Sequence, residues 1–147
     1  MKPPLRCEAD REAVREGLRD GTIDVIATDH APHSEDEKMV EFDQAPFGIV
    51  GLETALPLSL KLVEDGVLTL NEMIAKLTHL PSAVINVQKG TLNTGDTADI
   101  LIFDPDKKVK IDREKFRSKS KNTPFSGWDL KGVVLYTIVN GNIVYSD

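Results

Sequence analysis

One short segment limits the folds open to this chain more than any other. The segment IDVIA, at residues 23–27, is apolar along nearly its whole length and rich in β-branched side chains. A run of this kind is typical of a strand that is covered on both faces, as in a parallel sheet. The charged segment 9–20 before it carries the narrow apolar stripe of a surface helix, and Gly21 suits its end. We therefore predict a helix that leads into a parallel strand, which indicates the α/β fold class.

Further helices are expected in the middle of the chain, after a long polar loop. The segment 52–66 is predicted to be a helix. Its buried face would comprise Leu52, Leu56, Leu60 and Val63. Thr69 and Glu72 have the spacing of a capping box ahead of another helix, which would carry His79 as a structural residue near its end. Residues 81–86 are expected to form one more short helix.

The pattern changes to antiparallel strands in the last third of the chain. Residues 97–104 are predicted to form a strand. Asn140 and Gly141 lie between two β-rich runs, which is a strong signal for a type I′ hairpin. A change in composition separates these strands from the helices. We therefore expect two parts, an α/β part over residues 1–87 and a β part over residues 88–147.

The composition is that of a soluble protein with the length of one average domain. Of the 147 residues, 40% are hydrophobic and 29% are charged, and no apolar run approaches the ~18 residues that span a bilayer. The net charge of −6 argues against nucleic-acid binding, and the basic cluster at 113–121 is predicted to be a solvated loop. With Cys7 as the single cysteine and no visible secretory signal, we expect a cytoplasmic setting without disulfides.

The stretch with the most distinctive chemistry follows the predicted strand. The sequence TDHAPH places Asp29 just past the carboxyl end of that strand, where α/β folds carry their catalytic groups. A carboxylate there can ligate a metal or accept a proton from a metal-bound water. Pro32 disfavours a helical pairing of His30 with His33, so at most one of them is expected to face a site. A turn-forming Asp29 beside solvated histidines explains the residue types equally well.

A second candidate site is the stretch APFGIVGLET at residues 45–54, which leads from a loop into a helix. Pro46 precedes Gly48 and Gly51 in this stretch. The two glycines would let backbone N–H groups approach a ligand, and the N-terminus of a helix favours an anion. A tight connection from loop to helix, without any ligand, accounts for the same residues.

Five segments of the sequence together resemble a known enzyme family. They are PPLR (3–6), DVIATDHAPH (24–33), PFGIVGLETALPL (46–58), LPSAVINVQKGTLNTGDTADILIFDP (80–105) and TIVNGNIVY (137–145). In this order they are similar to the C-terminal part of bacterial-type dihydroorotase. That family is a group of zinc amidohydrolases that interconvert carbamoyl-aspartate and dihydroorotate in pyrimidine synthesis. The combination of DHAPH with PFGI and GLET favours dihydroorotase over the related enzymes that open hydantoin or allantoin rings.

The resemblance implies a fold and a set of site residues. The fold would be the C-terminal part of a (β/α)8 amidohydrolase barrel, with only the last of its eight strands, plus part of a small β-sandwich. Asp29 would ligate the metal and act as general base and then acid, and His33 would hold the carboxylate of the substrate. Pro46 and Gly48 would border the pyrimidine ring. Lys2 stands where the family has a substrate-contacting asparagine, so that contact is altered, lost or replaced by pairing with a carboxylate.

The resemblance also implies that this chain needs a partner. The His-x-His pair and the other metal ligands of the family match no residue here, and zinc needs three or four protein ligands to bind tightly. An N-terminal dihydroorotase chain would supply them and would cover the unpaired edges of the predicted strand. We therefore expect the isolated chain to be inactive and to bind no stoichiometric zinc. The alternative is a non-catalytic, dihydroorotase-like remnant that serves as a scaffold, for example for aspartate carbamoyltransferase.

Overall fold

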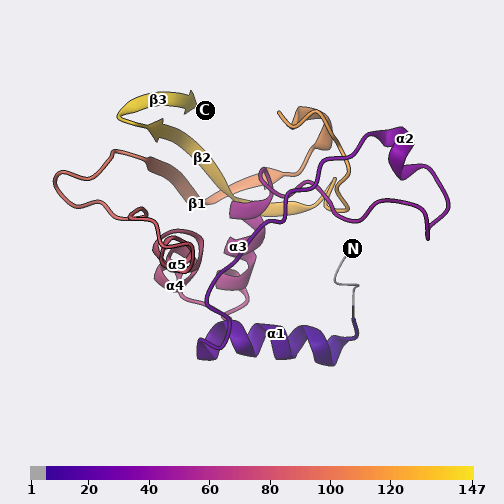
Figure 1. The fold of residues 1–147 in the computed structure, drawn as a ribbon, viewed down its shortest axis with the longest axis horizontal. Helices are drawn as coiled ribbons and strands as arrows, with labels where there is room; N and C mark the ends of the chain where they lie inside the picture. The colour runs from indigo at the N-terminus through magenta and orange to yellow at the C-terminus, as the bar shows by residue number, and fades with distance from the viewer. Residues whose placement is uncertain (1–5) are drawn as a thin grey trace.

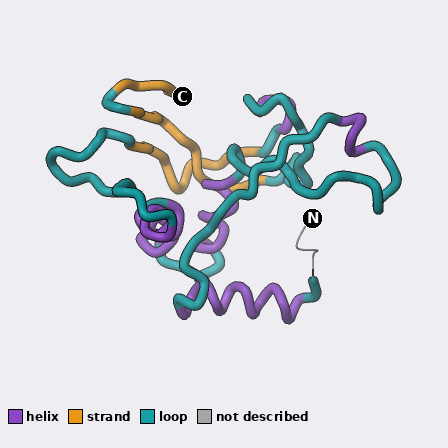
Figure 2. The backbone as a smooth tube through the Cα atoms, in the orientation of Figure 1, coloured by secondary structure: helices purple, strands orange, loops and turns teal. Residues whose placement is uncertain are grey.

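The computed structural model describes residues 6–147, in which the helices come first and an antiparallel sheet comes last (Figure 1). Long loops connect several of these elements (Figure 2). The boundary predicted between residues 87 and 88 falls in the loop from α5 to β1. The elements are α1 (Glu8–Asp20), α2 (Glu35–Lys38), α3 (Ala55–Glu64), α4 (Leu70–Leu77), α5 (His79–Val84), β1 (Ile100–Lys110), a 3-10 turn (Arg113–Lys115), β2 (Asp129–Val139) and β3 (Asn142–Ser146).

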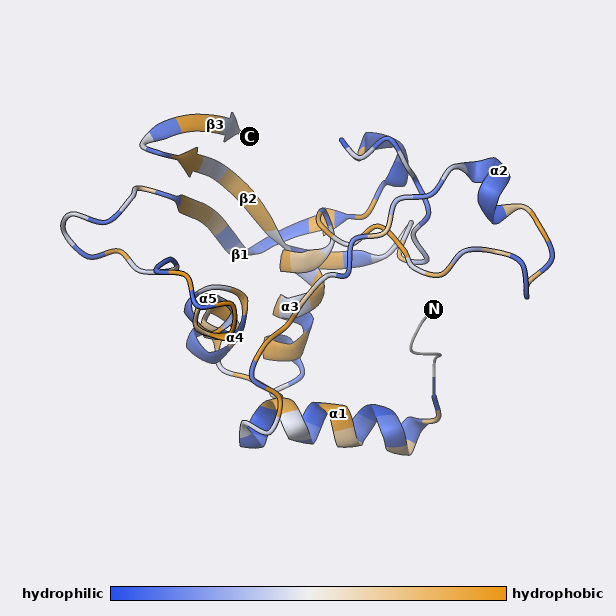
Figure 3. Cartoon of the chain, viewed as in Figure 1, coloured by the Kyte–Doolittle hydropathy of each residue, from blue (hydrophilic) through white to orange (hydrophobic). Residues whose placement is uncertain are grey.

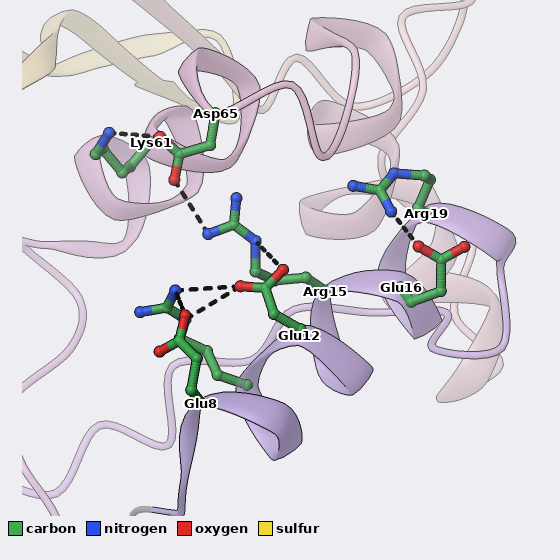
Figure 4. Close-up of polar contacts among 8 residues, drawn as sticks. Glu8, Glu12, Arg15, Glu16, Arg19, Lys61 and Asp65 are labelled. Atoms are coloured by element: carbon green, nitrogen blue, oxygen red, sulfur yellow. Dashed lines mark hydrogen bonds and ion pairs between the residues drawn. The ribbon is translucent and has the colours of Figure 1, made fainter.

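The first helix, α1, forms as predicted and is joined to the end of α3 by an ion pair. It ends at Gly21, whose φ of 84° lies in the left-handed region that terminates helices. Arg15 Nη1 lies 3.3 Å from Oδ2 of Asp65, the residue after α3, and Lys61 Nζ lies 2.5 Å from the other oxygen of that carboxylate (Figure 4). Leu18, near the end of α1, is buried in the core. The charged face and the apolar face of α1 therefore both contribute to its attachment.

The hydrophobic core lies between α1, α3, α4 and the turn that joins the last two. Five buried side chains form its centre, and Phe103 of β1 packs against them. Met73 of α4 is fully buried, with an exposed fraction of 0%. The five are Leu18, Leu60, Val67, Leu68 and Met73.

The helix predicted over 52–66 is shorter in the structure, because α3 begins only at Ala55. The prediction that Leu52 lies on its buried face is wrong, since Leu52 precedes the helix and is 63% exposed. The cause is a turn held by a side chain: the N–H groups of Gly51 and Leu52 both point to the ring of His30. The other predicted residues are buried or half-buried: Leu56, Leu60 and Val63.

The fourth helix, α4, begins with the predicted capping box. The Thr69 side chain accepts from the Glu72 N–H, and the Glu72 carboxylate accepts from the Thr69 N–H at 2.7 Å. The prediction that His79 lies near the end of this helix is wrong, because His79 is the first residue of α5. Thr78 separates the two helices, since its φ of −125° and ψ of −94° are not helical.

The predicted strand over residues 23–27 is not present in the part of the chain that the structure describes. Within residues 6–147 no strand pairs with this segment, so no ladder forms and the prediction is wrong. The segment is instead held by α4. The Ile26 N–H donates to the Lys76 carbonyl at 3.0 Å, and the Lys76 ammonium donates to the Ile23 carbonyl. Lys76 is only 6% exposed, and this buried cation anchors the segment.

The sheet has the strand order β1-β2-β3, and both pairs are antiparallel. Asn140 and Gly141 have φ values of 49° and 76° and join β2 directly to β3, so the predicted hairpin is confirmed. The strand predicted at 97–104 corresponds to β1. Its pairing with β2 is interrupted between Asp104 and Lys108, where Pro105 has no N–H to donate.

The helix α3 packs directly against β2, and one glycine makes the close approach possible. Gly132 in β2 has a φ of 104°, and a Cβ atom there would lie 2.3 Å from Leu60 Cδ1. Any other residue would therefore meet both backbone strain and a collision. Figure 1 shows α3 lying between α1 and the sheet as a result.

Several apolar side chains remain exposed, among them residues around the end of α5 and on the strands of the sheet. Figure 3 colours the ribbon by hydropathy and shows apolar stretches in both places. Ordinary soluble monomers expose single apolar residues, whereas grouped ones indicate surfaces that another chain or segment covers. Within residues 6–147, no helix combines the length and the apolar character that crossing a membrane requires. The exposed residues include Val84, Ile85, Val87 and Leu92 at and after the end of α5, and Leu101, Ile143 and Val144 on β1 and β3.

Candidate functional site

The two candidate stretches from the sequence lie side by side in the structure. A parallel bridge joins His30 to Ile49, and the Ala31 N–H donates to the Ile49 carbonyl at 2.9 Å. We name residues 28–34 the histidine loop and residues 46–51 the glycine loop. The structure thus brings together residues that are separated in the chain by the whole of α2 and the loop that follows it.

Asp29 stands at the start of the histidine loop with an exposed carboxylate. Its φ of 44° lies in the left-handed region, which costs a non-glycine residue on the order of 1 kcal/mol and which Asp tolerates better than most. No residue among 6–147 donates a hydrogen bond to this side chain. The carboxylate is therefore free to ligate a cation or to accept a proton.

His30 has a structural role that the sequence did not indicate. Its Nδ1 accepts from the Gly51 N–H at 3.0 Å and faces the Leu52 N–H at 3.4 Å. This ring nitrogen must be unprotonated to accept, so Nδ1 is committed to the turn that precedes α3. His30 therefore fixes the glycine loop against the histidine loop.

His33 is half-buried and hydrogen-bonded through its ring. Its Nε2 lies 2.9 Å from the Phe47 carbonyl oxygen, which can only accept, so Nε2 carries a proton. Its Nδ1 lies 3.7 Å from Glu37 Oε2. The hydrogen bond from the Ser34 N–H is the main cause that lowers the pKa of Glu37, and the nearby His33 adds to it. Nδ1 therefore faces the Glu37 carboxylate, and it can donate only when the ring is protonated.

Pro46 and Gly48 lie in the glycine loop, and a single lysine holds both of their carbonyl groups. Lys38 Nζ donates to the Pro46 oxygen at 2.6 Å and to the Gly48 oxygen at 2.8 Å. Gly48 has a φ of 98°, and a Cβ atom there would lie 2.3 Å from the Ala31 Cβ. Only glycine fits this position, because the two loops approach so closely.

A segment from the far end of the chain folds back onto both loops. Residues 117–122, which we name the return segment, follow the 3-10 turn and contact the histidine loop through Ser120 and the glycine loop through Asn122. The sequence predicts this region to be a solvated basic loop. That prediction holds for the exposed Lys119 but is wrong for Ser120, which is buried because it hydrogen-bonds to the histidine loop.

A cavity of about 350 Å³ opens beside His33. Side chains of both charges line it, and Asp29 is not among them. Asp29 and His33 therefore do not share this cavity. Its lining comprises His33, Ser34, Glu35, Lys38, Met39, Arg113, Glu114, Lys119, Ser120, Lys121 and Asn122.

Zinc is the cofactor that the sequence resemblance implies, and residues 6–147 fit it only in part. No three His, Cys, Asp or Glu side chains in this range gather closely enough to hold a metal ion. The unpaired carboxylate of Asp29 suits one ligand position, and tight binding needs two or three more. Lys2, the remaining predicted site residue, lies outside the residues that the structure describes.

The fold and the paired loops belong to a known class of hydrolase. Residues 2–144 match the amidohydrolase family, so the chain is a member of that family. Curated relatives in it are dihydroorotases: that of Syntrophus aciditrophicus is 54% identical over 147 residues, and that of Desulforapulum autotrophicum is 57% identical over 145 residues. These alignments cover 100% and 99% of this chain but 34% of each relative, so the chain spans about a third of their length. The predicted resemblance to part of a dihydroorotase is confirmed.

Solved structures of related enzymes have the same fold. The L-hydantoinase (dihydropyrimidinase) of Arthrobacter aurescens is 35% identical with a TM-score of 0.90, over 98% of this chain and 33% of that one. The dihydropyrimidinase of Brevibacillus agri is 25% identical with a TM-score of 0.92, over 98% of this chain and 33% of that one. The predicted fold class, an incomplete amidohydrolase barrel of mixed helix and sheet, is confirmed.

Proposed function

We propose that this chain is part of a dihydroorotase, which catalyses the reversible hydrolytic cyclisation of N-carbamoyl-L-aspartate to dihydroorotate in pyrimidine synthesis. The identity of 54–57% with dihydroorotases carries the proposal, because the hydantoinase and dihydropyrimidinase structures are only 35% and 25% identical. The exposed, unpaired carboxylate of Asp29 supports it, since the reaction needs a group that can exchange a proton.

Asp29 is assigned the proton transfer. In the ring-opening direction, the attacking water gives a proton to the Asp29 carboxylate, and Asp29 then gives that proton to the amide nitrogen that leaves. Zinc, when bound, supplies the Lewis acidity that makes water a nucleophile at neutral pH. Asp29 would provide one of its ligands, and the others would come from outside residues 6–147.

The histidine loop and the glycine loop are assigned substrate binding. His33 would hold the carboxylate of the substrate. Its Nε2 contacts the Phe47 carbonyl, so the substrate would take the place of Glu37 at Nδ1. The backbone of Pro46 and Gly48 would border the ring, with Lys38 fixing their carbonyl groups. Lys2 stands where the family has a substrate-contacting asparagine. Its side chain would contact the substrate directly, or its ammonium group would pair with a carboxylate instead.

The whole enzyme needs the part of a dihydroorotase that this chain does not match. The exposed apolar side chains around α5 and on the sheet fit such an addition, because the missing part would cover them. A scaffold role, for example beside aspartate carbamoyltransferase, would use the same surfaces. The two alternatives differ in activity, since only the first requires Asp29.

The test is to supply this chain with the unmatched part of the Syntrophus aciditrophicus dihydroorotase and to assay dihydroorotate hydrolysis. The assembly should be active and the chain alone inactive. Asp29→Asn should lower kcat by about 10²- to 10⁴-fold, the usual contribution of a general acid or base. The matched control is Asp24→Asn, an exposed aspartate in the preceding segment, which should leave kcat unchanged.

Two results would contradict the proposal. An assembly that forms but has no activity would favour the scaffold role. Activity that survives Asp29→Asn would show that another group transfers the proton.

A further inference from the structure

The contacts between the return segment and the two site loops extend the proposed function to residues that act on the backbone of those loops. Ser120 Oγ accepts from the His33 N–H at 3.0 Å and also contacts the His33 carbonyl. Ser120 is 8% exposed, and its hydroxyl lies 2.5 Å from Asn122 Oδ1. A buried hydroxyl with partners on both sides fixes the backbone of His33 rather than its ring.

Asn122 links the two loops to each other. Its Nδ2 donates to the Ala31 carbonyl at 3.0 Å and to the Gly48 carbonyl at 3.3 Å, which uses both amide protons. Its backbone carbonyl accepts from the Val50 N–H at 3.1 Å. The side chain therefore sits between the histidine loop and the glycine loop and holds one carbonyl group from each.

Glu53 holds the other end of the return segment. Its two carboxylate oxygens accept from the N–H groups of Arg117 and Ser118, at 2.7 Å and 3.0 Å. Hydrogen bonds to a charged group are stronger than those between neutral groups. The segment is thus anchored by Glu53 at its start and inserted between the loops at its end.

We propose that Ser120 and Asn122 are positioning residues for substrate binding, acting through the backbone of His33 and Gly48. This inference rests on the proposed function, in which His33 and Gly48 contact the substrate. Neither Ser120 nor Asn122 contacts Asp29. Their loss should therefore weaken binding and leave the proton-transfer step nearly intact.

The experiment uses the complete assembly described above and separates KM from kcat. Asn122→Asp keeps the size of the side chain but places a carboxylate against two carbonyl oxygens. It should raise KM for dihydroorotate about tenfold or more and change kcat by less than about threefold, because Asn122 holds the loops assigned to binding and does not contact Asp29. Ser120→Ala should act in the same direction, and Ser120→Thr, which keeps the hydroxyl, should restore most of the affinity. Ser126→Ala, an exposed serine past the segment, is the control.

Amide hydrogen exchange gives a second reading that does not depend on activity. In Asn122→Asp, the amides of His33 and Val50 should exchange faster, while those of β1 and β2 remain unchanged. An unchanged KM in a well-folded variant would overturn the proposal and leave the proposed function standing. If the wild-type assembly proves inactive on dihydroorotate, the proposed function fails. Amide hydrogen exchange is then the only test of whether Ser120 and Asn122 position the loops. Faster exchange would then retain Ser120 and Asn122 as positioning residues of the loops, and unchanged exchange would remove that role.

Discussion

The antiparallel sheet and the segment 23–28 show two ways in which β-forming sequence behaves in one chain. The strands β1, β2 and β3 find their partners within about fifty residues of chain, and each pair forms a ladder. The segment 23–28 has equally strong β character but no ladder, and Lys76 and α4 hold it instead. Its backbone groups therefore depend on a few contacts rather than on a sheet.

The difference teaches where each region gets its stability. A hairpin with a two-residue turn places its two strands side by side, so their pairing needs no distant part of the chain. A parallel strand needs a neighbour that comes from a distant part of a chain. The candidate site begins at the end of the unpaired segment 23–28, which Asp29 directly follows.

The largest effect expected from this difference is in amide hydrogen exchange. The N–H groups of Val25, Ala27 and Thr28 should exchange almost without protection in the 147-residue chain. Amides paired between β1 and β2 should be slower by about 10³-fold or more, the protection that cooperative unfolding gives. Adding the unmatched part of a dihydroorotase should slow the first group. Slow exchange in the chain alone would mean that another partner, such as a second copy, pairs with the segment.

A smaller effect is expected where the sheet meets α3. Gly132→Ala should lower the free energy of unfolding by about 2–4 kcal/mol, from backbone strain at positive φ and from the collision with Leu60. Gly141→Ala is the matched control, because its φ is also positive but nothing lies near its Cβ, and it should cost only about 1 kcal/mol. Urea unfolding measures both. Equal losses would show that strain alone matters and that α3 can move away.

The smallest effect is expected at the anchor of the unpaired segment. Lys76→Met keeps the length of the side chain but leaves the Ile23 carbonyl without its donor, which should cost about 1–2 kcal/mol. The exposed Lys108→Met serves as the control and should be near neutral. A more stable Lys76→Met variant would show that burying the charge costs more than the hydrogen bond contributes.

The elements predicted correctly from the sequence depend on residues a few positions apart. The capping box at Thr69 and the turn at Asn140 and Gly141 both form as expected. The incorrect predictions involve partners that a local pattern cannot reveal. The segment 23–27 lacks a neighbouring strand, and the ring of His30 draws Leu52 into a turn instead of a helix.

The residues of the candidate site also fall into two groups, those that a local sequence motif identifies and those that only long-range contacts reveal. Motifs identify Asp29, His33 and Gly48, because these residues lie in two compact stretches of unusual composition. Ser120 and Asn122 escape such a search, since they contact residues that lie 74 to 91 positions earlier. Basic neighbours also make their segment resemble an ordinary solvated surface. Nothing in the spacing of serine or asparagine distinguishes a buried contact of this kind.

The hydrogen bonds from Lys38 to Pro46 and Gly48 close the base of the loop over residues 39–45. The loop above that closure projects into solvent, and Phe42 at its tip is 97% exposed. We therefore expect insertions, deletions or a proteolytic cut within 40–45 to leave both carbonyl groups in place. The Lys38 ammonium group thus divides the chain into two parts. The sequence of the exposed loop can vary, whereas the glycine loop next to it must keep its shape.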